Sequence, residues 1–85
     1  MKQVLMYTGE YCSFCEAAKA LLKTKNVTIN EINISKDPSK RIEMQKRTGG
    51  AKTIPQIFIG NTYIGGNDQL QLLEQNKKLD KIIKG

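Results

Sequence analysis

The two cysteines of this chain, Cys12 and Cys15, are separated by two residues and are the only thiols in its 85 residues. They follow a short apolar run over residues 4–7 and open a stretch with helical periodicity. Two thiols at this spacing can close a small disulfide ring and open it again, which stores two electrons. A CxxC pair between a strand and a helix is typical of redox motifs in intracellular chains. The motif therefore predicts thiol–disulfide exchange chemistry.

The expected position of the pair assigns a role to each sulfur. Cys12 lies at the predicted helix entrance, where free backbone N–H groups and the helix dipole favour negative charge. The pKa of a free thiol is about 8.5, and it falls to about 3.5–7.5 for CxxC cysteines at helix starts. We therefore expect Cys12 to be the nucleophilic thiolate and Cys15, one turn further in and more buried, to be the resolving thiol. Glu10 and Glu16 oppose this effect, because nearby carboxylates disfavour a further anion.

Two other interpretations of the pair are a zinc half-site and inert core cysteines. A structural zinc site requires four ligands, and the chain offers two cysteines and no histidine. Inert burial fits poorly with this spacing at the start of a helix. The redox interpretation is the one that the residues favour.

Composition narrows the function class further. The length predicts one small domain spanning residues 1–85. The formal net charge is +6, but the basic residues are spread along the chain, so nucleic-acid binding is not expected, whereas acidic small molecules would be attracted. No stretch approaches a membrane span, and we expect a cytoplasmic monomer without a membrane partner.

Hydrophobic periodicity predicts the first half of the fold. Residues 3–7 indicate a buried strand, and the next apolar residues share one face of a helix that ends at Asn26. These residues are Phe14, Ala17, Ala18, Leu21 and Leu22. Residues 27–34 alternate as a half-buried strand does, which gives a parallel strand–helix–strand unit.

Turn and capping residues delimit the second half. Asp37-Pro38 starts a weakly apolar helix that ends near Gly49-Gly50. Gly60-Asn61 suits a type II′ turn between strands over residues 57–59 and 62–64. Asn67-Asp68 is a plausible cap for a last helix. Its apolar stripe comprises Leu70, Leu72, Leu73, Leu79, Ile82 and Ile83. The predicted order is βαβαββα.

Three segments carry a resemblance to a known family: residues 7–12 (YTGEYC), 53–59 (TIPQIFI) and 65–68 (GGND). Together with the CxxC pair they resemble the glutaredoxins, specifically the small dithiol bacterial kind, over essentially the whole chain. The resemblance implies an α/β thioredoxin fold with a four-stranded mixed sheet flanked by helices. It also implies a glutathione-disulfide oxidoreductase that acts in cell redox homeostasis by reducing protein disulfides and glutathione mixed disulfides.

The resemblance also implies which residues bind glutathione. The bond before Pro55 would be cis, and Ile54 would present its backbone to the cysteinyl unit. Backbone N–H groups of Asn67 and Asp68 would meet the γ-glutamyl carboxylate, and the Asp68 side chain its ammonium group. Arg41 and Lys52 would face the glycyl carboxylate. The full expected set is Phe14, Arg41, Lys52, Thr53, Ile54, Pro55, Gly66, Asn67 and Asp68.

Three residues depart from the family pattern. Gly9 occupies the stretch where a lysine is usual, Phe14 replaces the usual tyrosine, and Ser13 replaces the usual proline. The Ser13 hydroxyl is a possible donor to the Cys12 thiolate. A serine at this position is also found in glutaredoxins that bridge a 2Fe–2S cluster, although we do not expect a cluster here because the second cysteine, Cys15, is present. No other metal site is expected.

The expected reaction begins with attack of Cys12 on the protein sulfur of a glutathione mixed disulfide, or on a protein disulfide, and Cys15 or a second glutathione then resolves the intermediate. Ribonucleotide reductase is one candidate protein substrate. Two alternatives are a glutathione-ligated 2Fe–2S carrier and an electron donor to ribonucleotide reductase that depends on thioredoxin reductase. The GGND segment argues against the second, because that class lacks the glutathione pocket.

Overall fold

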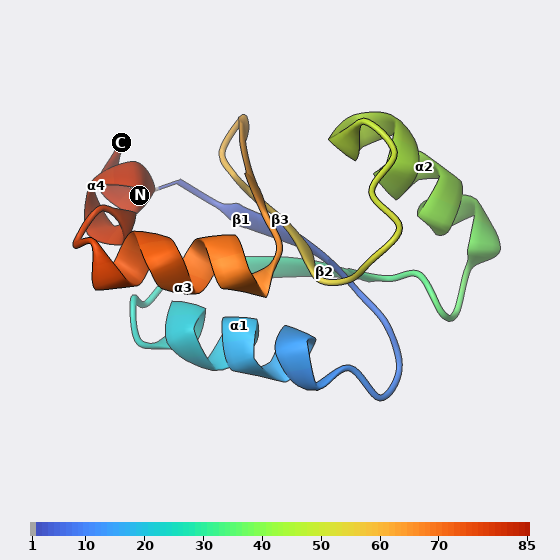
Figure 1. Cartoon of the computed structure of the whole chain (residues 1–85), viewed down its shortest axis with the longest axis horizontal. Helices are drawn as coiled ribbons and strands as arrows, with labels where there is room; N and C mark the ends of the chain where they lie inside the picture. Colours follow the sequence, from blue (N-terminus) through green and yellow to red (C-terminus); the bar gives the residue numbers. More distant parts are fainter. Residues whose placement is uncertain (1) are drawn as a thin grey trace.

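A computed structural model describes residues 2–85 and contains one four-stranded sheet with helices on both faces (Figure 1). The strands are β1 (Val4–Thr8), β2 (Ile29–Asn33), β3 (Gln56–Ile59) and β4 (Thr62–Gly65), in the spatial order β2-β1-β3-β4. The helices are α1 (Ser13–Lys23), α2 (Pro38–Thr48), α3 (Asn67–Gln75) and α4 (Leu79–Lys84). β1 pairs in parallel with β2 and antiparallel with β3, and β3 pairs antiparallel with β4. The predicted mixed sheet of a thioredoxin fold is confirmed.

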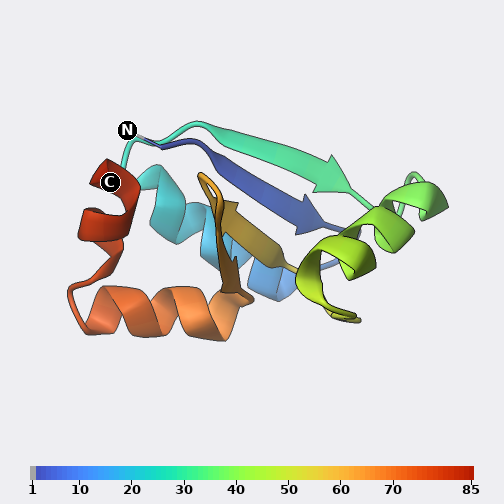
Figure 2. The ribbon, with the colours of Figure 1, turned by 90° about the horizontal axis from the view of Figure 1, so that it is seen from above.

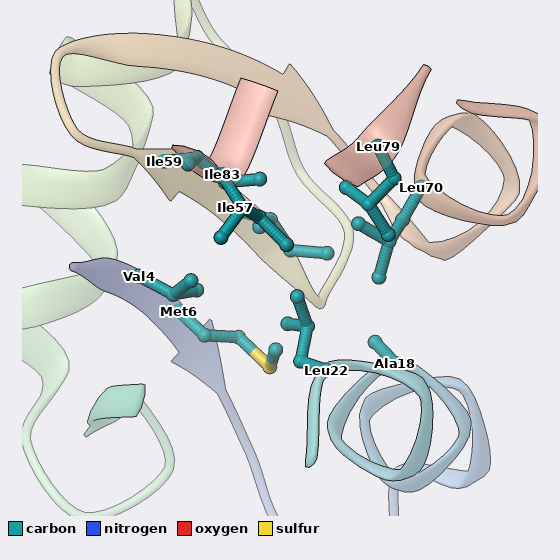
Figure 3. Packing of buried hydrophobic residues seen from close by; sticks show 9 residues of the cluster. All are labelled: Val4, Met6, Ala18, Leu22, Ile57, Ile59, Leu70, Leu79 and Ile83. Carbon is teal, nitrogen blue, oxygen red and sulfur yellow. The ribbon is translucent and has the colours of Figure 1, made fainter. Parts of the chain in front are cut away.

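The larger core lies on the face of the sheet that α1, α3 and α4 cover (Figure 3). Successive strand residues point to opposite faces, so Val4 and Met6 of β1 and Ile57 and Ile59 of β3 enter the same cluster. The helices contribute Ala18, Leu22, Leu70, Leu79 and Ile83. Because β1 and β3 lie in the middle of the sheet, the ends of these two strands are fixed by packing on both faces.

The smaller core lies on the other face, which α2 covers. It consists of Tyr7, Ile34, Met44 and Phe58. Met44 is the one buried residue of α2, and Ile42 keeps 56% of its surface exposed. Figure 2 shows α2 alone, beyond the ends of β1 and β2 and apart from the other helices. The prediction that this helix packs loosely is confirmed.

A polar network fastens α2 to the sheet. The hydroxyl of buried Tyr7 donates to Glu43 Oε2 at 2.6 Å, and Arg47 Nη1 donates to the same hydroxyl oxygen at 3.1 Å. The Arg47 guanidinium also lies 4.6 Å from the centre of the Phe58 ring. The hydrogen bond from the Tyr7 hydroxyl, with a smaller contribution from Lys40, lowers the pKa of the Glu43 carboxyl. Burial is the main cause that raises the pKa of Tyr7.

Most predicted element boundaries fall within three residues of those in the structure. Asp37 caps α2 by accepting a hydrogen bond from the Ser39 N–H, and Gly49 ends it with φ 74°. Gly60 has φ 58°, as a type II′ turn requires at its first central position. The predicted cap at Asn67-Asp68 was wrong by one position, because Gly66 caps α3 and both residues lie in its first turn.

The apolar face predicted for the first helix was partly wrong. Phe14 and Ala17 are exposed, and the buried side chains of α1 are Cys15, Ala18 and Leu22. The helix begins at Ser13, and the buried residues are three and four positions apart, as on one face of a helix. This face includes the second cysteine, whereas Phe14 and Ala17 lie one position before it. Phe14 is therefore free of the core, and its ring is available to the site.

The last predicted helix is two helices. α3 ends at Gln75, Lys77 adopts a left-handed backbone with φ 59°, and α4 starts at Leu79. The Lys78 N–H donates to the Leu73 carbonyl at 2.9 Å, which closes the break. The turn directs Leu79 and Ile83 into the larger core, so the order is βαβαββαα. Within residues 2–85, no helix has the length and apolar character needed to cross a membrane.

The Tyr7–Glu43 hydrogen bond predicts a specific acid sensitivity. The pKa of Glu43 in the folded chain lies below its ordinary value of 4.5, so its stabilisation is present above about pH 4.5 and is lost as the pH falls through the folded-state pKa. We expect Glu43→Gln, which keeps an acceptor for Tyr7, to make the free energy of unfolding less dependent on pH between about pH 5 and pH 3. Urea denaturation of both proteins across this range measures the effect. Equal pH dependence in the two proteins would contradict it.

Candidate active site

Cys12 caps the N-terminus of α1, directly after the loop that leaves β1. Its backbone is extended, with φ −111° and ψ 99°, and its Sγ accepts a hydrogen bond from the Cys15 N–H at 3.1 Å. A disulfide joins Cys12 to Cys15, so the structure is that of the oxidised chain. An N–H placed at this sulfur also stabilises a thiolate on the same atom after reduction, because a hydrogen bond to the charged form favours that form.

The two sulfurs differ in access. Cys15 belongs to the buried stripe of α1 and keeps 1% of its surface exposed, whereas Cys12 is only half-buried. An incoming disulfide therefore reaches Cys12 first. This geometry supports the expected roles of the pair, with Cys12 as the attacking thiolate and Cys15 as the resolving thiol.

The carboxylate next to the pair in α1 is neutralised by a lysine. Lys19 Nζ lies 2.8 Å from Glu16 Oε2 and 3.3 Å from Glu31 Oε1, and the Thr8 hydroxyl donates to Glu31 Oε2 at 2.9 Å. The hydrogen bond from Lys19 lowers the pKa of Glu16, and the ammonium group balances the charge of this exposed carboxylate. The expected opposition of Glu16 to a Cys12 thiolate is thereby reduced.

On one side of Cys12 the chain forms a groove of about 660 Å³. The Ile54 carbonyl oxygen lies 3.9 Å from Cys12 Sγ, and the Ile54–Pro55 peptide bond is cis, as the family resemblance implied. The groove is lined by Phe14, Thr53, Ile54, Pro55, Gln56, Tyr63, Ile64, Gly65, Gly66, Asn67, Asp68 and Gln69. Seven residues of the expected glutathione set therefore come together beside Cys12 from three separate segments.

The wall of this groove contains a hydrogen-bonded side chain that the sequence analysis did not assign to the site. Gln56, 3% exposed, donates from Nε2 to the Thr53 carbonyl at 2.9 Å and accepts a hydrogen bond from the Tyr63 hydroxyl. The Tyr63 ring also packs on Phe58, which faces it across the β3–β4 pair. A polar residue at the start of an otherwise apolar strand was the available signal for Gln56. The other groove residues without a predicted role are Tyr63, Ile64, Gly65 and Gln69.

The far end of the groove is the N-terminus of α3. Gly65 has φ 112°, and a Cβ there would lie only 3.0 Å from Gln69 Oε1. The Gln69 side chain folds back over this glycine, and its Oε1 accepts from the Gly66 N–H at 2.8 Å. The groove residues Asn67 and Asp68 are the first two of α3, where backbone N–H groups lack acceptors within the helix. Such an end favours a bound anion, a carboxylate included.

Two residues of the expected set are not part of the groove wall. Arg41 is exposed on α2, and Lys52 is exposed in the loop before Thr53. Ser13 is exposed. Among the hydrogen bonds of residues 2–85, Cys12 Sγ contacts the Ile54 carbonyl and the Cys15 N–H, and its partners do not include the Ser13 hydroxyl. Phe14, 61% exposed, does line the groove as an aromatic side chain without a hydroxyl.

A second concave surface of about 460 Å³, here called the outer hollow, includes Cys12 itself. The outer hollow is lined by Gly9, Glu10, Tyr11, Cys12, Ser13, Glu16, Lys19, Glu31 and Asn33. It carries three carboxylates and one ammonium group. The groove and the outer hollow are lined by different residues, and the reactive sulfur lies between Ile54 of the groove and the loop of the outer hollow.

Gly9, where the family usually has lysine, is closely packed. A Cβ atom at this position would lie 2.6 Å from Ile54 Cδ1 and 2.9 Å from Ser35 Oγ. The Ser35 hydroxyl in turn accepts a hydrogen bond from the Glu10 N–H at 3.0 Å. The space next to Gly9 is therefore filled by side chains of the groove and of the loop after β2.

The described residues offer no ready metal site. Across residues 2–85, histidine, cysteine, aspartate and glutamate do not gather in a group of three or more that could hold an ion. The two cysteine sulfurs bond to each other. Thiol–disulfide exchange can open and close such a disulfide.

Comparison with known proteins is consistent with this chemistry. The glutaredoxin family model matches residues 4–64. Glutaredoxin 3 of Escherichia coli is 45% identical over 84 residues, covering 99% of this chain and 100% of that protein. The solution structure of glutaredoxin from Brucella melitensis is 48% identical with a TM-score of 0.85, covering 99% of this chain and 90% of that one.

A more distant neighbour is a buckwheat glutaredoxin–glutathione complex, with a TM-score of 0.87 and 22% identity over 98% of this chain and 77% of that one, which shows the shared fold. The match to the family model and the identity to bacterial glutaredoxins point to the same chemistry as the site does. The site has an accessible cysteine sulfur at a helix start and a buried cysteine one turn away. The chain therefore belongs to the glutaredoxin family and is a thiol–disulfide oxidoreductase.

Proposed function

We propose that this oxidoreductase takes its electrons from glutathione and reduces protein–glutathione mixed disulfides and protein disulfides. The observation that carries the proposal is the groove that runs from the Ile54 carbonyl, 3.9 Å from Cys12 Sγ, to the N-terminus of α3. A tripeptide with a central thiol and a carboxylate at each end suits a site with a sulfur in reach and an anion-binding helix end. The fold neighbour in complex with glutathione supports the same proposal.

The groove assigns a role to each part of the proposed ligand. The Ile54 backbone would pair with the cysteinyl unit and hold its sulfur next to Cys12, while Phe14 shields one side. Backbone N–H groups of Asn67 and Asp68 would bind the γ-glutamyl carboxylate. The exposed Asp68 carboxylate would bind the ammonium group. Thr53, Pro55 and Gly66 complete the wall between these two ends.

This placement changes the first step that the sequence suggested. If the groove holds the glutathione half of a mixed disulfide, the sulfur beside Cys12 is that of glutathione and not that of the protein. The Cys12 thiolate then attacks the glutathione sulfur, a Cys12–glutathione disulfide forms, and the protein thiolate leaves and takes up a proton. A second glutathione thiolate attacks the glutathione sulfur of that intermediate, which releases glutathione disulfide and regenerates the Cys12 thiolate.

A protein disulfide uses the second cysteine. Cys12 attacks one protein sulfur, and the other leaves as a thiolate and is protonated. Cys15 then attacks Cys12 Sγ, which frees the second protein thiol and forms the Cys12–Cys15 disulfide seen in the structure. Two glutathione molecules reduce this disulfide and become one glutathione disulfide. We place this cycle in the cytoplasm, where cysteine pairs are kept reduced and catalytic.

Cysteine variants test the proposed cycle. We expect Cys12→Ser to abolish all exchange, because the accessible nucleophile is lost. Cys15→Ser is expected to retain turnover of a small glutathione mixed disulfide and to lose reduction of a protein disulfide. The measurement is NADPH consumption coupled through glutathione and glutathione reductase. Equal losses in both variants would contradict the assigned roles, and turnover with thioredoxin reductase in place of glutathione would contradict the proposed electron source.

Lys52 and Arg41, the two basic residues expected to bind glutathione, can be compared as a variant and its control. Lys52 adjoins the groove residue Thr53, whereas Arg41 lies on α2, so Lys52 is the better partner for the glycyl carboxylate. We expect Lys52→Gln to raise the KM for glutathione about two- to fivefold, the size of one exposed ion pair, with a smaller effect at high salt. Arg41→Gln is the control and should leave this KM as it is. A larger effect of Arg41→Gln would reverse the assignment.

The close packing at Gly9 predicts that the lysine usual in the family would disturb the groove in this chain. Gly9→Lys places a Cβ against Ile54 Cδ1 and Ser35 Oγ. We expect it to lower kcat/KM for a glutathione mixed disulfide, because Ile54 of the groove must move, and to destabilise the fold by at most about 1 kcal/mol, because both contacted atoms end flexible side chains. Combining Gly9→Lys with Ile54→Val, which removes Cδ1, should recover part of both losses. Urea denaturation and the coupled assay measure them; higher activity of the single variant would refute the packing argument.

A further inference from the structure

Tyr11 is the most exposed large hydrophobic side chain of the described residues and directly precedes the nucleophile. Its backbone is left-handed, with φ 52°. Non-glycine residues adopt this conformation uncommonly, and a bulky side chain does so at a cost. The ring is fully exposed, so it takes no part in either core. Folding alone therefore does not account for an aromatic side chain at this position.

The loop that carries Tyr11 is anchored at both sides. The Glu10 N–H donates to Ser35 Oγ at 3.0 Å, and the Ser35 N–H donates to Asn33 Oδ1 at 2.9 Å, which ties the loop to the end of β2. On the other side, Cys12 is fixed as the cap of α1. The backbone that carries the exposed ring is therefore already ordered, which lowers the cost of ordering the loop when a partner binds.

The exchange reaction requires a place for the second half of its substrate. Every disulfide has two halves, and the groove beside Ile54 suits the glutathione half. A second concave surface, the outer hollow, is lined by Tyr11 together with Cys12. The polypeptide half leaves from the glutathione sulfur in line with the attacking Cys12 Sγ, so its chain lies outside the groove and can reach the exposed surface of the loop that carries Cys12.

We propose that Tyr11 is a docking residue for the polypeptide half of a protein–glutathione mixed disulfide, which binds in the outer hollow. This inference rests on the proposed function, because it takes the groove to be occupied by glutathione. Tyrosine suits the role because it offers a large, partly apolar contact area and is enriched at interfaces. Tyr11 thus makes the enzyme prefer polypeptide substrates to small mixed disulfides.

The test compares two substrates in the same glutathione-coupled assay. One is a synthetic glutathionylated peptide whose cysteine is flanked by lysines, chosen because the outer hollow carries three carboxylates against one ammonium group. The other is the mixed disulfide of glutathione and 2-mercaptoethanol. The readout is the ratio of kcat/KM for the peptide to kcat/KM for the small substrate.

Two variants of Tyr11 separate the effect of the ring from that of the backbone, and a third variant elsewhere is a control. Tyr11→Asn tolerates the left-handed conformation but removes the ring, and we expect it to lower the ratio about two- to tenfold, as loss of one aromatic contact does. Tyr11→Phe keeps the ring and should keep the wild-type ratio. Ile42→Ala removes an exposed apolar side chain on α2, away from both cavities, and should also keep it.

A purely structural role of Tyr11 gives different results. It would shift the pKa of the Cys12 thiol, measured as the pH dependence of its alkylation rate, whereas docking leaves that pKa the same in Tyr11→Asn. An unchanged ratio in Tyr11→Asn, an equal fall in Tyr11→Phe, or a parallel shift of the thiol pKa would each overturn the docking role. A wild-type chain that turns over neither substrate with glutathione would instead overturn the proposed function.

Discussion

The start of α1 is the point on which the rest of this structure depends, because the N-terminal cap of that helix is a cysteine. Cap residues normally satisfy a free backbone N–H with a side-chain oxygen. Here the sulfur of Cys12 accepts the Cys15 N–H, so one atom both terminates the helix and carries the chemistry. The helix can hold that sulfur in place only because its buried stripe packs against β1 and β3.

The central position of β1 explains how the other half of the site reaches the same sulfur. β1 lies between β2 and β3, and its antiparallel partner β3 begins at Gln56, directly after the cis Ile54–Pro55 bond. The segment that enters β3 therefore passes the end of β1, where the active-site loop begins. Pairing of Tyr7 with Gln56 fixes this meeting point in register, and the Ile54 carbonyl comes to lie beside Cys12.

Much of this arrangement could be predicted from the sequence, for identifiable reasons. Strong local signals, such as Asp37-Pro38 before α2 and Gly60 in the hairpin, specify their own backbone geometry and were predicted correctly. The cis bond before Pro55 followed from the family resemblance alone. The break at Lys77 was missed, because its left-handed backbone is stabilised by the return of Leu79 and Ile83 to the core, which is a tertiary effect.

The predictions for the site residues also divide into those that could be made from the sequence and those that depend on tertiary packing. Ile54 and Gly66, which line the groove, were predictable because the family resemblance placed their segments beside the reactive cysteine. Arg41 and Lys52 were expected from the family resemblance, and the position of an exposed, long side chain depends on packing that such a resemblance does not encode. Gln56 and Tyr63 were missed because their contact exists only once the β3–β4 pair has formed.

The contact between the two ends of the described chain has a practical consequence for fusion proteins made with this domain. The Lys2 N–H donates to the carbonyl of Ile83, so the two ends of the described chain lie together, at the end of the molecule away from the loop that carries Cys12 (Figure 1). A second domain, an affinity tag or a fluorescent reporter joined at either end would leave both cavities at the reactive sulfur uncovered. A short linker could even join the two ends, since circular permutation is tolerated where termini are exposed and adjacent. The domain is therefore a modular redox unit that can be attached from either direction.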